Sequence, residues 1–212
     1  NTVSLTTGTQ KNQTYVSVGA VNARGIIQNN DLDRYNFSVR NTTSMLNDKL
    51  TMDLSFMYSN VKEQNMLSQG EYANPLVPVY LFPRGDDFSK YQYYERYDVD
   101  RNIKTQFWPL KENGLSMQNP YWITNRNMYT NKKDRFLASG SLKYTITDWL
   151  NVSGRVKLDK ETINSEKKMY ASTLNVIAEN SDKGAYVQSN KNTSQIYADA
   201  MLNINKYFYH DT

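Results

Sequence analysis

Acidic residues in the middle of the chain come closest to a pattern that could do chemistry. Asp98–Asn102 has the opening spacing of a calcium-binding loop, but Ile103 stands where that loop needs glycine and Pro109 where it needs glutamate. Asp86 and Asp87 offer two carboxylates, yet adjacent loop residues are poorly placed to flank one glycosidic bond. A calcium site built otherwise from Asp86, Asp87, Asp98 and Asp100 stays open as an alternative, and a solvated acidic loop is the favoured interpretation.

Side chains for nucleophilic or redox chemistry are missing from the sequence. It has no Cys and a single His, His210, in the turn at its C-terminal end. A nucleophile–base pair and a thiolate metal site therefore lack their residues, and there is no glycine-rich phosphate loop. The net charge of +4 is spread along the chain and gives no basic patch for nucleic acid. We expect a protein that is not an enzyme, has no metal or cofactor, and binds no nucleic acid.

Aromatic side chains concentrate in the long connection Lys62–Asp134 and point to binding instead. Flat rings stack on sugars or peptide groups, and Asn or Arg side chains supply hydrogen bonds. Arg84 could hold a carboxylate, or it could pair with a neighbouring aspartate to order the loop. Most rings of this connection are expected to form its own small core. The residues predicted to contact ligand are Tyr80, Arg84, Tyr94, Trp108, Tyr121, Trp122 and Asn125.

The elements that hold this loop are β-strands, because apolar and polar residues alternate with period two. The predicted strands are Thr2–Thr9, Thr14–Asn22, Arg34–Arg40, Leu50–Ser59, Arg135–Ile146, Leu150–Asp159 and Gln195–Asn205. Their length of about 8–12 residues is close to what a tilted strand needs to cross a bilayer. By contrast, the chain has no run of about 20 apolar residues that would make a transmembrane helix.

The apolar faces of these strands favour lipid over a second protein layer. Gly140, Gly154 and Ala198 lie mid-strand on that face, where a packed core would use bulkier side chains. Aromatic residues gather near the strand ends, as in the two girdles of membrane barrels: Tyr35, Phe56, Tyr58 and Phe136 at one end, and Tyr144, Trp149, Tyr207 and Phe208 at the other. The residues predicted to face lipid are Tyr35, Phe37, Leu54, Phe56, Leu142, Val156 and Leu202.

The connections between strands alternate between short and long. Short turns are predicted at Gln10–Gln13, Leu46–Lys49 and Thr147–Trp149, and long connections at Arg24–Asp33, Lys62–Asp134 and Lys160–Ser194. Outer-membrane barrels have short periplasmic turns and long extracellular loops, and they suit a hydrophobic fraction of 39% and a mean hydropathy of -0.74. Seven strands leave unpaired edges, and Asn1 begins within a strand-like run. The sequence is therefore expected to be one section of a larger barrel.

Short motifs follow one another in a fixed order along the chain. They are Arg34-Tyr35-Asn36-Phe37, Asn74-Pro75-Leu76, the segment Tyr80–Phe88, Arg101-Asn102-Ile103, Asn119-Pro120-Tyr121-Trp122, Asn125-Arg126, and Thr147-Asp148-Trp149-Leu150 within the hairpin Arg135–Leu158. Their order and spacing resemble the SusC/RagA family, the TonB-linked outer-membrane proteins of Bacteroidetes-type bacteria. The resemblance covers nearly the whole chain, although each motif alone is weak.

This resemblance implies an all-β, antiparallel transmembrane barrel of about 22 strands filled by a plug. Residues 1–212 would be part of that one barrel domain, without its plug and remaining strands, and 62–134 would be a long extracellular loop. The implied function is TonB-dependent import of an oligosaccharide, or of a peptide, across the bacterial outer membrane. A SusD-like surface lipoprotein would cover the barrel as a lid, and TonB would act through the plug.

Two alternatives share the strand features. A passive porin would have the same wall without a plug. A soluble carbohydrate-binding or adhesin β-domain would fold in water and use the aromatic loop as its binding face. In the barrel interpretation, the charged face lines the interior. There, six residues could bind substrate, but they are expected instead to form cross-strand ion pairs and to contact the plug: Arg40, Asp53, Lys143, Arg155, Lys157 and Asp199.

Overall fold

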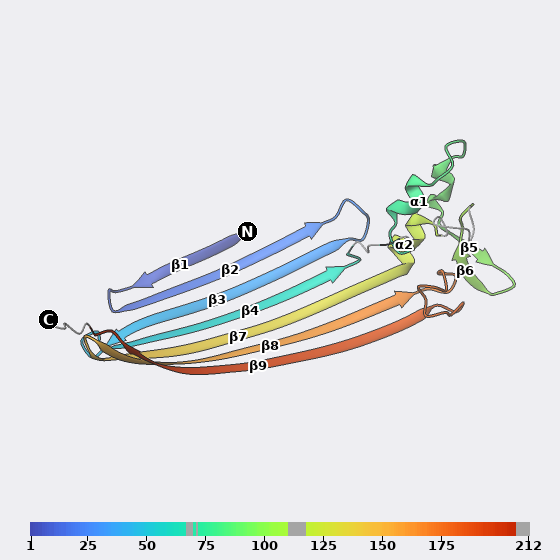
Figure 1. Ribbon diagram of the computed structural model, residues 1–212. Coiled ribbons are helices and arrows are strands. Elements are labelled where there is room, and N and C mark those ends of the chain that lie inside the picture. Colours follow the sequence, from blue (N-terminus) through green and yellow to red (C-terminus); the bar gives the residue numbers. More distant parts are fainter. Residues whose placement is uncertain (67–69, 71, 110–117, 207–212) are drawn as a thin grey trace, which may run out of the picture.

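The chain forms one large antiparallel sheet with a small lobe at one end (Figure 1). This computed structural model describes residues 1–66, 70, 72–109 and 118–206, so the predictions for Tyr207, Phe208 and His210 lie outside the described residues. Its strands are β1 (Thr2–Gly8), β2 (Asn12–Arg24), β3 (Asp31–Met45), β4 (Leu50–Gln64), β7 (Asn127–Thr147), β8 (Leu150–Met169) and β9 (Ala185–Ile204). They lie side by side in that order, which confirms the predicted all-β antiparallel fold.

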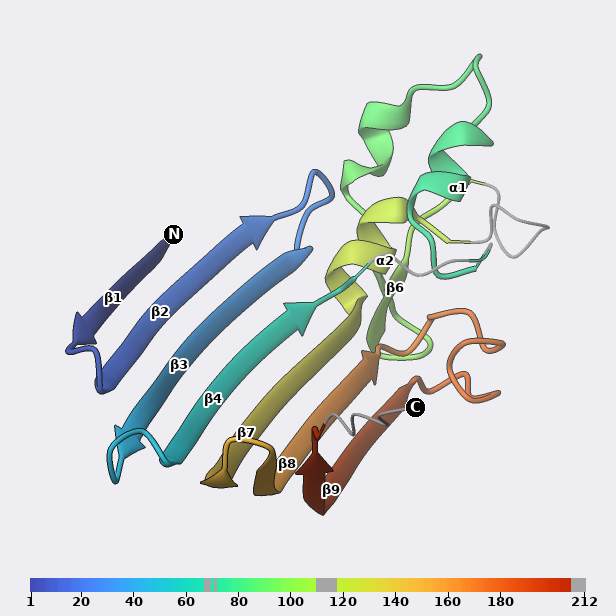
Figure 2. The same cartoon turned by 60° about the vertical axis from the view of Figure 1, so that its left-hand side comes forward.

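The lobe consists of residues 72–109 and 118–126, together with the connection 170–184 that packs against them. Its elements are α1 (Leu76–Tyr80), a 3-10 helix η1 (Phe88–Gln92), β5 (Glu95–Asp98), β6 (Ile103–Gln106) and α2 (Pro120–Arg126). Figure 2 shows it standing at the end of the sheet where β4 and β8 finish. Neither α1 nor α2, the α-helices of the described residues, is long and apolar enough to cross a membrane.

Several strands are longer than the sequence predicted. β7 has 21 residues, and β8 and β9 have 20 each, so the long connections shrink to 65–126 and 170–184. The added length is mostly polar on both faces, which removes the period-two signal, but the ladder continues from strand to strand. Side chains reinforce it: Thr162 donates to Asn192 at 2.8 Å, and Ser165 donates to Asn131 at 3.0 Å. Pairing with neighbours therefore decides where these strands end.

The register places all the apolar runs on one face of the sheet. Val18 lies opposite Phe37, Phe37 opposite Tyr58, and Tyr58 opposite Phe136. Directly opposed residues of an antiparallel pair point to the same side, so these side chains share one face. We call it the apolar face, and we call the other, which carries Arg40 and Asp53, the charged face.

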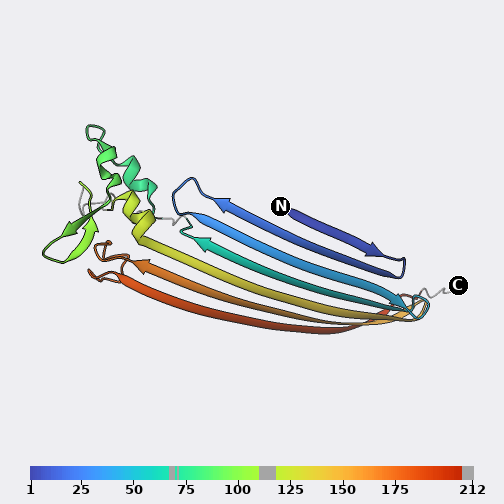
Figure 3. The same ribbon diagram turned by 180° about the vertical axis from the view of Figure 1, so that it is seen from behind.

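The sheet is a single layer, as Figure 3 shows edge-on. Within its described strands, the only residue classed as buried is Asn127, at the start of β7. The buried side chains of the described chain are otherwise found in the lobe, among them Tyr91, Trp108 and Trp122. A sheet normally buries its apolar face against another layer. Here the lobe covers only the end of the charged face, and no other described part of the chain covers either face.

Candidate functional site

The lobe has a small aromatic core of its own. Tyr91 packs with its ring centroid 5.4 Å from Trp108 and 5.6 Å from Phe82, and Phe82 lies 5.0 Å from Phe88. Burial and the hydroxyl's hydrogen bond to Asp86 raise the pKa of Tyr91, so this ring stays neutral. Ring pairs at these distances stabilise beyond their buried area. The core thus uses some of the aromatic residues that made this segment resemble a binding loop, whereas Tyr80, Tyr93 and Tyr97 are exposed.

Asn119 joins the parts of the lobe from a fully buried position. Its carboxamide oxygen accepts from the backbone N–H of Tyr121 at 2.8 Å and so caps α2. Its amide nitrogen donates to the backbone oxygens of Tyr91 and Phe107 at 2.8 and 2.9 Å. Pro120 follows at the first helical position, where its missing N–H costs nothing. One side chain therefore fixes α2 against two other segments.

Replacing Asn119 by alanine is expected to destabilise the lobe by about 3 kcal/mol, because a helix cap is lost and two buried carbonyls lose their donor. Hydrogen exchange of the lobe amides in the full-length protein measures this. Asn74→Ala is the matched control: Asn74 is half-buried and accepts from the backbone N–H of Leu76, the first residue of α1, and the loss of this one hydrogen bond is worth about 1 kcal/mol. Equal effects of the two substitutions would contradict the role given to Asn119.

Glu95 links the β5–β6 hairpin to α2. Its carboxylate oxygens lie 2.6 Å from Lys104 Nζ and 2.7 Å from Arg126 Nη2. The Arg126 guanidinium also lies over the ring of Tyr170, 4.9 Å from its centroid. Burial alone would raise the pKa of Glu95, but the hydrogen bonds from Lys104 and Arg126 outweigh it and hold that pKa below its ordinary value.

This lowered pKa predicts an acid-sensitive lobe. The folded-state pKa of Glu95 is below its unfolded value of about 4.3, so its stabilising contribution is present above that pH and is lost as the pH falls through the folded value. Hydrogen exchange of the lobe should stay constant from neutral pH to about pH 5, after correction for intrinsic rates, and quicken below that. Glu95→Gln should weaken the lobe at neutral pH and flatten this acid dependence. An unchanged acid profile in that variant would refute the assignment.

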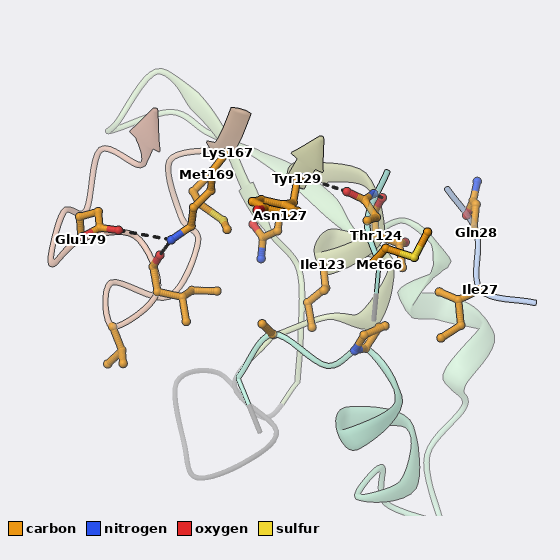
Figure 4. Close-up of a pocket in the computed structure, with 15 residues that line it drawn as sticks. Ile27, Gln28, Met66, Ile123, Thr124, Asn127, Tyr129, Lys167, Met169 and Glu179 are labelled. Atoms are coloured by element: carbon orange, nitrogen blue, oxygen red, sulfur yellow. Dashed lines mark hydrogen bonds and ion pairs between the residues drawn. The ribbon is translucent and has the colours of Figure 1, made fainter. Parts of the chain in front are cut away.

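A cavity of about 630 Å³ lies where the lobe meets the sheet (Figure 4). That volume is typical of small-ligand sites. The chain segments that form it are far apart in sequence, from the turn after β2 to the connection between β8 and β9. Its wall consists of Ile27, Gln28, Asn65, Met66, Ala73, Pro75, Ile123, Thr124, Asn127, Tyr129, Lys167, Met169, Val176, Ile177 and Glu179.

The cavity lies over the charged face of the sheet. Asn127 and Tyr129 are on the same face of β7 as Arg135. Their register partners on β8, Met169 and Lys167, share that face. Residues two apart on a strand share a face, so this part of the wall continues the charged face toward the lobe. The cavity therefore lies at the end of the charged face that is next to the lobe.

Hydrogen bonds hold the polar part of the wall from behind. Asn65 donates to the backbone oxygen of Thr124 at 3.3 Å and accepts from the N–H of Tyr129 at 2.8 Å. Asn127 accepts from the hydroxyl of Thr173 at 2.7 Å. These bonds tie β4, β7, α2 and the connection 170–184 together. They fix the positions of Asn65, Thr124, Asn127 and Tyr129 in the wall.

The seven residues predicted to contact ligand have different environments. Trp108 and Trp122 are buried in the lobe core and present almost no surface to a ligand in this conformation, while Tyr80 and Arg84 are exposed. The remaining three are half-buried and engaged inside the lobe: Tyr94 lies beside Arg126, Tyr121 beside Phe88, and Asn125 accepts from Asn29. None of the seven lines the described wall of the cavity.

Three of the four acidic residues considered for calcium or catalysis have structural partners. Asp86 accepts from the hydroxyl of Tyr91 at 3.0 Å, Asp87 caps η1 by accepting from Ser89, and Asp98 accepts from the backbone N–H of Arg101. Among the described residues, no group of three or more His, Asp or Glu side chains is arranged to hold a metal ion.

The residues predicted to face lipid all lie on the apolar face, without a covering layer in the described chain. Tyr35, Phe37, Leu54, Leu142, Val156 and Leu202 are exposed, and Phe56 is half-buried between its neighbours. Its ring contacts those of Phe37 and Phe136, with centroids 6.0 and 4.9 Å away. The tyrosines beside this aromatic row direct their hydroxyls to polar partners: Tyr58 donates to Asp134 at 2.6 Å, and Tyr35 accepts from Asn22 at 3.1 Å.

The charged face carries ion pairs between neighbouring strands. They include Arg40–Asp53 at 2.7 Å, Arg135–Asp159 at 2.6 Å and Arg155–Asp199 at 2.8 Å. This confirms the cross-strand pairing predicted for Arg40, Asp53, Arg155 and Asp199. The same prediction was wrong for Lys143 and Lys157, which form no ion pair with another described residue. Solvent-exposed pairs of this kind contribute little to stability, about 0–1 kcal/mol each. Their main consequence is a strongly polar surface opposite an apolar one.

No known protein family matches the chain, and no curated protein is significantly similar to it. The function is therefore inferred from the arrangement of side chains described above. Sequence reasoning missed the residues of the cavity, because they come from separate segments and form no motif. The one available signal was the set of aliphatic residues, such as Ile123 and Ile177, inside otherwise polar connections.

Proposed function

We propose that this chain is a section of the wall of an outer-membrane β-barrel. The observation that carries the proposal is the single-layer sheet with an uncovered apolar face on one side and ion-paired charges on the other. A large contiguous apolar surface is rarely left in water. Lipid outside and water inside satisfy both faces of a barrel wall, and the open edges of β1 and β9 would pair with further strands.

The path of the apolar residues across the sheet supports a tilted wall. The apolar run of β2 is centred on Val18. The residues that lie opposite one another across the following strands are, in order, Phe37, Tyr58, Phe136, Lys160 and, in β9, Ser194. In β9, however, the run is centred on Ala200, six residues further along. The centre of the apolar run thus shifts along the strands by about 4 Å for each of the five steps from one strand to the next. Because neighbouring strands lie about 4.8 Å apart, this shift corresponds to a strand tilt of about 40°. Membrane barrels tilt their strands by about 35–45°.

The height of the apolar band also supports a membrane setting. On β7 the band runs from Phe136 to Ile146, about 33 Å along the strand. At a tilt of about 40° this projects to about 25 Å, the usual height of the apolar band in outer-membrane barrels. Tyr58 bounds the band on the lobe side and Trp149 on the short-turn side, where Lys206 lies 5.1 Å from the Trp149 ring. Amphipathic rings at both margins are typical of membrane–water interfaces.

The specific activity that we propose is TonB-linked import of a nutrient, an oligosaccharide or a peptide, by a transporter of the SusC/RagA type. The short motifs that resemble this family support it, and several of them build the lobe: Asn119-Pro120-Tyr121-Trp122 is the cap and first turn of α2, and Asn74-Pro75-Leu76 begins α1. In this arrangement the lobe stands at the outer mouth, beneath a SusD-like lipoprotein lid. The charged face meets the plug through which TonB acts.

Energised uptake distinguishes this proposal from its alternatives. A deletion strain of the native host is grown on single polysaccharides and on a peptide digest, to find a nutrient whose use requires the gene. Uptake of that nutrient should stop when a protonophore collapses the energy supply. Uptake that persists without energy would identify a passive porin, and recovery of the full-length protein from the soluble fraction would identify a soluble β-domain. Either result would overturn the proposal.

A further inference from the structure

Eight of the fifteen residues that line the described cavity beneath the lobe are aliphatic or methionine. Ile27, Ile123 and Ile177 contribute branched side chains, and Met66 and Met169 contribute thioethers (Figure 4). Such a wall gains free energy by removing apolar surface from water. Methionine side chains adapt to irregular shapes, so the wall fits apolar groups of somewhat different outline. The occupant that suits it has an aliphatic or thioether group of its own.

The same wall is poorly suited to a sugar ring. Tyr129 is the single aromatic side chain among the residues that line the described cavity. The rings that could have made stacking platforms, such as Tyr91 and Trp108, pack against one another in the lobe core. The aliphatic part of the wall offers a sugar neither a flat ring face nor hydrogen bonds, so only the polar side chains of the wall could contact its hydroxyls. The cavity therefore disfavours an oligosaccharide, which is one of the two kinds of cargo proposed above.

The polar groups of the wall carry both donors and acceptors. Lys167 Nζ lies 3.3 Å from a carboxylate oxygen of Glu179 and donates to the backbone oxygen of Ile177 at 2.9 Å. The Glu179 side chain is 64% exposed, so its carboxylate can still accept from a ligand. Gln28 is exposed and offers an amide with both functions. A peptide has one donor and one acceptor at nearly every residue, whereas an acyl chain has neither along its length.

We infer that this cavity binds an uncharged aliphatic or thioether side chain of a peptide, while the peptide backbone meets Gln28, Lys167 and Glu179. This inference rests on the proposed import function and narrows its cargo to peptides. The position of the cavity over the charged face places the bound side chain beside the interior of the proposed barrel.

The test measures binding to the full-length protein in detergent by calorimetry. The probes are Gly-Gly-Ile-Gly-Gly, the same peptide with serine in the centre, a linear glucose pentasaccharide and a medium-chain fatty acid. The isoleucine peptide should bind about tenfold to a hundredfold more tightly than the serine peptide, because about three carbons more are buried. Tighter binding of the saccharide or of the fatty acid would overturn the inference, as would equal binding of the two peptides.

A substitution that fills the cavity locates the effect. Val176 lines the wall and is 61% exposed, so Val176→Trp should occupy the space without disturbing the fold. Val99, 79% exposed and between β5 and β6, lies outside the cavity wall, and Val99→Trp is the matched control. The first variant should lose the preference for isoleucine and the second should keep it. A preference that survives Val176→Trp would show that the side chain binds elsewhere.

Uptake of the same labelled peptide by cells separates the two proposals. If protonophore-sensitive uptake is lost with Val176→Trp and kept with Val99→Trp, both stand. If the binding preference and its loss are seen but uptake needs no energy, the import mechanism fails and the peptide site stands. If energised uptake of another nutrient occurs and the peptides show no preference, the peptide site fails and the import function stands.

Discussion

Leu142→Arg is expected to destabilise the assembled protein by about 2–4 kcal/mol, which lowers the ratio of folded to unfolded protein about 30-fold to 1,000-fold. Leu142 lies near the centre of the apolar band on β7 and is 51% exposed in the isolated chain. If that face meets lipid, an arginine at this depth loses its hydration. The amount of heat-modifiable, folded protein in the outer membrane measures the effect, and urea titration in liposomes gives the free energy.

Met201→Arg is the matched control for this substitution. Met201 is also apolar and is 48% exposed, but it lies on the charged face with Asp199. If that face lines a wet interior, the new arginine stays hydrated and the free energy of unfolding changes by about 0.5 kcal/mol or less. A soluble domain would tolerate both substitutions, because both side chains would already be in water. Similar, small effects of the two variants would therefore refute the membrane assignment.

The strands and their faces were predictable because alternation is a local signal. Leu54, Phe56 and Leu142 read as one apolar face from the sequence, and the register confirms it. The strand ends were not predictable: beyond Asp159 both faces of β8 are mostly polar, and only the pairing with β7 and β9 shows that the strand continues to Met169. Ladder hydrogen bonds depend on which strands lie side by side, and a local sequence pattern does not show which strands pair.

The candidate site was harder to predict than the fold. An aromatic-rich loop predicts both a binding surface and a small core, since the same rings serve either purpose. The structure assigns Trp108 and Tyr91 to the core and leaves Tyr80 at the surface. The cavity instead combines residues such as Met66, Ile123 and Met169 from three segments. Their proximity results from the chain's return to the sheet at Asn127, which no spacing in the sequence indicates.

Trp122→Ala is expected to unfold the lobe while the sheet stays intact, with a loss of about 3–5 kcal/mol in lobe stability. Trp122 is 1% exposed, and its indole N–H donates to the hydroxyl of Thr173 at 3.0 Å. That hydroxyl donates in turn to Asn127, the first residue of β7. The substitution leaves a large cavity and removes the link between α2 and the connection 170–184. Hydrogen exchange of the full-length protein should show faster exchange in the lobe and unchanged exchange in β3 and β4.

The same variant separates the two roles that an aromatic residue of this lobe can have. If Trp122 stacked on a ligand, its loss would weaken binding and leave lobe exchange unchanged. Because its ring is buried, we expect the reverse order: the lobe opens first, and binding at the adjacent Ile123 and Thr124 fails as a consequence. Tyr80→Ala is the control, since Tyr80 is 85% exposed and its loss should change lobe stability by about 0.5 kcal/mol or less. If Tyr80→Ala weakened binding while the lobe stayed stable, Tyr80 would belong to the ligand site.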